Sequence, residues 1–146
     1  MTIKASTGLR NGVMALASFR SLINLGSIKL YGGAVPFSAD DAESTTLLCT
    51  ITNASTATGL SLASAAANGE IPKTVGEVWS GVCSAGGVAT HYRFIAPGDT
   101  GGSSISQPRI QGSVAAVGAD LVITNPTLAN GATQTIDYYT IALPTL

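Results

Sequence analysis

The segment Arg109-Ile-Gln-Gly-Ser-Val114 carries the clearest structural signal in this chain. Apolar or small residues alternate in it, one by one, with polar residues, and a period of two is that of a β-strand with one buried face. The residues expected to point inward are Ile110, Gly112 and Val114, and those expected to point outward are Arg109, Gln111 and Ser113. The segment therefore predicts a strand in a sheet that covers a core.

Comparable strand patterns recur from residue 27 onward. The predicted strands cover residues 27–31, 45–52, 75–83, 88–95, 109–117, 121–124 and 133–143. Turn-forming pairs such as Asn68-Gly69, Pro97-Gly98 and Asn130-Gly131 lie between several of them. Because no helical pattern separates the strands, the order favours a mainly β fold, an antiparallel β-sandwich of the jelly-roll or immunoglobulin-like type.

One N-terminal α-helix is expected before the sandwich, over residues 9–25, with Gly26 as its stop. One face of its helical wheel holds Leu9, Val13, Leu16, Phe19 and Ile23, and the opposite face also carries apolar residues, namely Met14, Leu22 and Leu25. Two apolar faces favour packing of one face on the chain's own domain and of the other on a neighbouring chain. The alternative is a helix enclosed in its own core. The candidate interface residues are Met14, Phe19, Leu22 and Leu25.

The chain is expected to form a single folding unit, because its 146 residues match the commonest domain size. Within it, residues 1–26 form the predicted N-terminal arm and helix, and residues 27–146 form the predicted β-sandwich domain.

The composition is unusually poor in charge. Charged residues make up 10% of the chain and the net charge is −1, whereas typical soluble domains carry roughly 25% charged residues. A surface with so little charge favours association with other chains. Seven Lys and Arg residues spread along the sequence form no basic stripe, so we expect no nucleic-acid partner. No apolar run reaches the roughly 18 residues of a membrane span, and we expect no membrane partner.

No catalytic, cofactor-binding or metal-binding constellation is predicted, so the chain is not expected to be an enzyme. Gly98-Asp-Thr-Gly-Gly102 resembles the nucleophile motif of chymotrypsin-like proteases, but Thr100 stands at the nucleophile position and His91 is the only histidine. We interpret the motif as a surface loop. A lone histidine is also too little for a zinc site, and we expect His91 to make a contact at a strand surface or an interface.

Two further groups have structural interpretations. Cys49 and Cys83 each lie in an apolar strand pattern, which predicts buried free thiols. The acidic segment Ser38-Ala-Asp-Asp-Ala-Glu43 lacks the spacing of a calcium loop, and it is expected to cap a short helical turn or to form a solvated loop.

Several segments, in order along most of the chain, resemble a family of small structural proteins encoded among the virion genes of tailed bacteriophages. These segments are Lys4-Ala-Ser-Thr-Gly-Leu-Arg10, Ser27-Ile-Lys-Leu-Tyr-Gly-Gly33, Ser38-Ala-Asp-Asp41, Arg93-Phe-Ile-Ala-Pro-Gly-Asp-Thr-Gly101, Arg109-Ile-Gln-Gly-Ser-Val114, Gly118-Ala-Asp-Leu121 and Gln134-Thr-Ile-Asp-Tyr-Tyr139. The resemblance implies a virion component, either a capsid decoration or cement protein or a tail accessory.

Together these observations predict a multi-copy, homo-oligomeric structural component of a virion, made in the bacterial host cytoplasm. Capsid decoration is favoured over a tail position, with the major capsid protein or a tail protein as partner. A carbohydrate-binding β-sandwich is the alternative from another class. The aromatic residues that could stack on a sugar are Trp79, Tyr92, Tyr138 and Tyr139.

Overall fold

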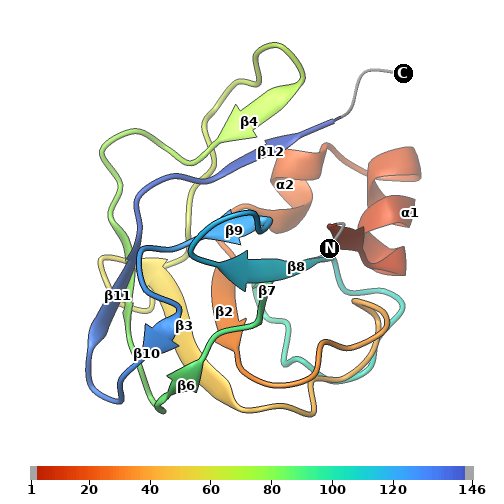
Figure 1. The fold of residues 1–146 in the computed structure, drawn as a ribbon. Coiled ribbons are helices and arrows are strands. Elements are labelled where there is room, and N and C mark those ends of the chain that lie inside the picture. The colour runs from red at the N-terminus through yellow and green to blue at the C-terminus, as the bar shows by residue number, and fades with distance from the viewer. Residues whose placement is uncertain (1–2, 144–146) are drawn as a thin grey trace.

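The computed structural model describes residues 3–143 and confirms a mainly β, sandwich-like fold with antiparallel sheets and helices near the N-terminus (Figure 1). The helices are α1 (Thr7–Ala15) and α2 (Phe19–Ile23). The strands are β1 (Lys4–Ala5), β2 (Ser27–Tyr31), β3 (Leu47–Asn53), β4 (Glu70–Pro72), β5 (Trp79–Val82), β6 (Gly87–Val88), β7 (His91–Ile95), β8 (Arg109–Ala115), β9 (Leu121–Val122), β10 (Thr127–Leu128), β11 (Thr133–Ile136) and β12 (Thr140–Ala142).

A long sheet runs in the order β1-β8-β7-β2-β3-β5-β11, with every neighbouring pair antiparallel. Strand β9 pairs with β8 in parallel orientation. Two small sheets, β10-β6 and β12-β4, complete the fold. One core joins side chains of β2, β3, β5, β7 and β8 of the long sheet with Tyr139, which lies between β11 and β12.

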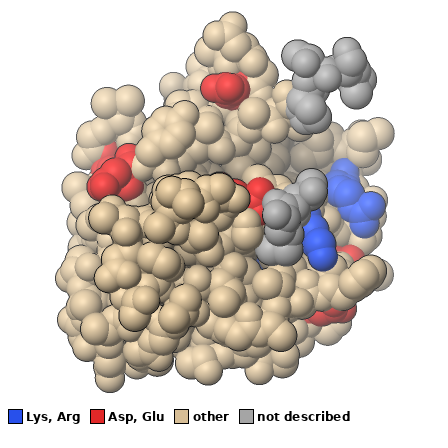
Figure 2. Space-filling view, viewed as in Figure 1, with Lys and Arg blue, Asp and Glu red and all other residues tan. Residues whose placement is uncertain are grey.

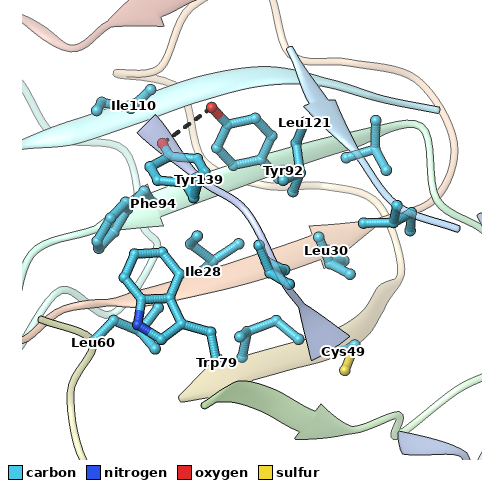
Figure 3. Close-up of a cluster of buried hydrophobic side chains, with 14 of the residues drawn as sticks. Ile28, Leu30, Cys49, Leu60, Trp79, Tyr92, Phe94, Ile110, Leu121 and Tyr139 are labelled. Carbon is cyan, nitrogen blue, oxygen red and sulfur yellow. Dashed lines mark hydrogen bonds between the residues drawn. The ribbon is translucent and has the colours of Figure 1, made fainter. Parts of the chain in front are cut away.

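Aromatic rings fill the centre of this core. Trp79 meets Phe94 edge to face, with ring centroids 5.9 Å apart, and Tyr139 packs against both of these rings. The hydroxyl groups of Tyr92 and Tyr139 are hydrogen-bonded at 3.2 Å, so neither phenol is buried without a partner (Figure 3). The alternation of β8 places Ile110 and Val114 in the same core, as its sequence predicts.

The single helix predicted over residues 9–25 is two shorter helices, because the chain turns between Ala15 and Phe19. The Ser18 side chain accepts a hydrogen bond from the backbone N–H of Ser21 at 3.2 Å and caps α2, which starts a new helix at this point. One wheel therefore does not describe both helices: on its first apolar face Leu9 and Ile23 are buried, but Val13 is 43% exposed. Leu16, which the wheel places on the core face, is 82% exposed.

Several predicted strands are shorter than their patterns or divided: residues 88–95 form β6 and β7, β8 ends at Ala115 and β9 ends at Val122. Only Trp79–Val82 of the segment 75–83 is a strand, since a turn with Gly76 at a φ of +83° precedes it. The segment 133–143 divides into β11 and β12 around residues 137–139. The division of the chain at residue 26 stays a prediction. In the structure, β1 of the N-terminal arm pairs with β8 of the long sheet.

Candidate functional site

The predicted interface residues of the arm fall into two pairs. Met14 on α1 is 85% exposed, and Leu25 just after α2 is 54% exposed. Phe19 and Leu22 are half-buried and pack against the core. Leu22 also contacts Gly12 of α1, where a Cβ would lie 2.7 Å from its side chain. We call the exposed residues Val13, Met14, Leu16 and Leu25 the arm surface; its use as an interface stays a prediction.

Other large apolar side chains are exposed in the loops. The most exposed of them are Phe37, Val75, Ile105, Val117, Tyr138 and Leu143, each at least 72% accessible. Sequence reasoning missed most of these positions because turns and loops have no hydrophobic period that distinguishes an exposed apolar residue from a buried one.

Four polar side chains on the second face of β7 and β8 are almost completely buried. His91, Arg93, Arg109 and Gln111 are at most 1% exposed. The alternation correctly separated Arg109 and Gln111 from the core face, but the expectation that they point to solvent is wrong. The segments between β2 and β3 and between β7 and β8 cover this face: Arg109 donates to the Ala39 carbonyl and Gln111 to the Pro36 carbonyl.

Arg109 and Asp99 form the centre of one half of this polar cluster. Two guanidinium nitrogens of Arg109 lie 2.5 and 2.8 Å from the two carboxylate oxygens of Asp99. Burial acts to raise the pKa of Asp99, but the hydrogen bonds from Arg109 and from the Gly101 N–H hold it below its ordinary value. The protease-like segment 98–102 is thus a loop whose acidic residue is paired with Arg109.

Glu43, His91 and Arg93 form the other half. The His91 Nε2 and Arg93 Nε atoms lie 3.0 and 3.1 Å from Oε1 of Glu43, whose side chain is 7% exposed. The His91 ring also stacks on Tyr31, and burial followed by the Glu43 charge raises the pKa of Tyr31 to about 12. The expected surface or interface contact for His91 is wrong, because the ring is fully buried in its own chain.

The acidic segment 38–43 is only partly as expected. The Asp41 carboxylate accepts a hydrogen bond from the Ser38 N–H at 2.9 Å, which is the backward contact of a capping box. Asp40 accepts from the N–H and hydroxyl of Thr7 and so fixes the start of α1. Glu43, in contrast, belongs to the buried cluster and not to a solvated loop.

Cys49 and Cys83 are buried as predicted, and both are thiols in the structure. They face each other across an antiparallel bridge between β3 and the end of β5. Burial, together with the neighbouring Cys83 thiol, raises the pKa of Cys49 to about 12. A thiol held in this state is a poor nucleophile.

Comparisons with protein-family models, with curated proteins and with solved structures found no match to this chain. Within residues 3–143, no helix has the length and apolar character needed to cross a membrane. In the same range, His, Cys, Asp and Glu side chains form no group of three or more that could hold a metal ion.

Proposed function

We propose that this chain is a multi-copy, homo-oligomeric structural component of a tailed-phage virion, most specifically a capsid decoration or cement protein. The observation that carries the proposal is that apolar side chains are exposed on the arm surface while several charged side chains are buried as ion pairs. The virion assignment is supported by the phage-like segments of the sequence, which include all of β2 and most of β8.

The surface is even poorer in charge than the composition indicates. Of the seven Lys and Arg and eight Asp and Glu side chains, the four that pair as Arg93 with Glu43 and Arg109 with Asp99 are at most 7% exposed. Figure 2 shows the result on one face, where isolated charged groups lie in a largely uncharged surface. Such a surface gives little electrostatic protection against association.

The arm surface is the part best suited to contact another chain. Met14 and Leu16 are more than four-fifths exposed at the end of α1, where an apolar side chain gains free energy only when a partner covers it. An assembly protein present in many copies adds the strengths of many small contacts, so each contact can be weak and neutral. The proposed role therefore needs no large dimer interface.

The test is the composition of purified particles of the phage that encodes the chain. Quantitative mass spectrometry should find the protein at a fixed ratio to the major capsid protein, and isolated heads without tails should retain it. Presence only in tails would transfer the proposal to a tail accessory, which is the second candidate. Absence from both heads and tails would overturn the virion function.

A further inference from the structure

We propose that the hollow between residues 120–124 and residues 135–140 is a binding site for a neutral or amine-bearing saccharide unit, with Tyr138 as the stacking residue. The hollow has a volume of about 390 Å³, which lies within the roughly 300–1,000 Å³ typical of small-molecule sites. This site is independent of the arm surface and of the assembly role proposed above.

The structure reduces the four candidate aromatic residues to one. Trp79, Tyr92 and Tyr139 are at most 4% exposed and belong to the core. Tyr138 is 72% exposed and lines the hollow. A tyrosine ring offers a rigid apolar face with negative charge density, which suits the polarised C–H groups on one side of a pyranose ring.

The polar lining supplies acceptors and hydroxyl groups. Among the described residues that line the hollow, the charged side chains are Asp120 and Asp137. The Oδ2 atom of Asp120 is held by the N–H and hydroxyl of Ser113, each at 2.8 Å, which fixes the orientation of the carboxylate. An ionised carboxylate only accepts hydrogen bonds, and sugar hydroxyl groups can donate to it.

Thr140 adds a further polar residue to the lining of the hollow. The residue lines the hollow, and its hydroxyl oxygen is buried and has no hydrogen-bond partner among residues 3–143. Leaving a buried hydroxyl unsatisfied is costly, so such groups in native proteins call for a specific explanation. Because this oxygen is buried, a ligand hydroxyl could pair with it only if the Thr140 side chain turned toward the hollow.

The floor of the hollow is rigid. Leu121 and Tyr139 line it and are also members of the core, where the Tyr139 ring is fixed by Trp79, Phe94 and the hydroxyl of Tyr92 (Figure 3). A preformed floor lowers the cost of ordering the site on binding. The two carboxylates repel acidic sugars, which is why the proposal specifies neutral or amine-bearing units.

The experiment measures binding of the full chain to a panel of hexosides, N-acetylhexosamines, amino sugars and matching uronic or sialic acids. Saturation-transfer NMR detects weak binders, and titration gives the dissociation constants. At least one neutral or amine-bearing sugar should bind, and its acidic counterpart should bind more weakly. Tyr138→Ala should weaken binding about tenfold because the stacking face is removed, whereas Tyr138→Phe should bind nearly as well as the wild type.

Two matched controls make the result specific. Phe37→Ala removes an even more exposed aromatic ring, which lies outside the hollow, and should leave affinity unchanged. Asp137→Asn should weaken binding, while Glu70→Gln, an exposed carboxylate outside the hollow, should not. The proposal is overturned if no panel member binds at millimolar concentration, or if Tyr138→Ala and Asp137→Asn both bind like the wild type. Neither result bears on the particle composition that tests the assembly role.

Discussion

Replacing Asp99 by Asn is expected to destabilise the protein strongly, because it removes the counter-charge of Arg109 but leaves the cation buried. Both side chains of the pair are 1% exposed. Removing one partner of a buried ion pair costs about 3–5 kcal/mol. Arg109 keeps two carbonyl acceptors, those of Ala39 and Gly102 at 3.2 and 2.6 Å, so we expect the lower end of this range, about 3 kcal/mol.

Urea unfolding followed by fluorescence measures this change directly. Trp79 is the only tryptophan and is 1% exposed, so its emission reports the loss of the core. With a slope of about 1–3 kcal/mol per molar urea, the midpoint should fall by about 1–3 M. Asp137→Asn, which changes an exposed carboxylate, is the control and should stay within about 0.5 kcal/mol of the wild type.

The pH dependence supplies a second readout. Since the pKa of Asp99 is lower in the folded chain than its ordinary value, the ionised carboxylate stabilises the fold above the unfolded-state pKa of about 3.9. This contribution is lost as the pH falls through the folded-state pKa. The difference in stability between the wild type and Asp99→Asn should therefore be full at neutral pH and shrink below about pH 4.

If Asp99→Asn lowers the free energy of unfolding by less than about 1 kcal/mol at neutral pH, the reasoning is refuted, because a solvent-exposed ion pair contributes about that much to stability. Replacing both partners, with Asp99→Leu and Arg109→Met, should recover part of the lost stability, since no uncompensated charge then stays buried. If the double variant is less stable than Asp99→Asn, the hydrogen bonds that Arg109 donates to the Ala39 and Gly102 carbonyls are also needed for stability.

Met14→Glu should weaken self-association measured by mass photometry and leave the circular dichroism unchanged, whereas Leu22→Glu should lower the unfolding midpoint because Leu22 is half-buried against the core. If Met14→Glu associates like the wild type, the arm surface is not the interface. Cys49 and Cys83 should react with a thiol reagent only after denaturation, and reaction of either in the native protein would contradict their burial. Particles washed in about 1 M salt, where the Debye length is only about 3 Å, should retain most copies of the protein. Loss of most copies would show that electrostatic contacts hold the protein on the particle.

A strand could be predicted from the sequence where only one of its faces packs on the hydrophobic core, because apolar and polar residues then alternate along it. In β8 the neighbours of Ile110 alternate cleanly, and the strand lies where its pattern places it. The burial of the other face could not be predicted, because its cover comes from irregular segments distant in sequence. The Pro36 and Ala39 carbonyls that receive Gln111 and Arg109 belong to a loop without a hydrophobic period.

The helical arm shows a different limit. Apolar residues at helical spacing continue from Leu9 to Ile23, so the pattern favours one helix. Hydrophobic spacing does not reveal a side chain that hydrogen-bonds to the backbone and so ends one helix and starts another. Ser18 is such a residue, because its hydroxyl accepts the hydrogen bond that caps the start of α2. The saccharide hollow was only partly foreseeable: Tyr138 is among the aromatic residues that the sequence suggests, but the hollow that it lines depends on tertiary packing.

The attachment of the arm to β8 affects when a newly made chain can finish folding. The Ser6 hydroxyl accepts from the Arg109 N–H at 2.9 Å, across 103 residues of sequence. A ribosome that adds about 5–20 residues per second needs roughly 5–20 s to supply this partner after Ser6 has been made. Until then α1 has no sheet to dock on, and the arm surface lacks its final geometry. Truncated chains that end before Arg109 should be cleaved in the arm by a protease that spares the complete chain. We therefore expect only chains synthesised beyond β8 to enter an assembly, which makes synthesis itself a checkpoint against incorporating shorter fragments.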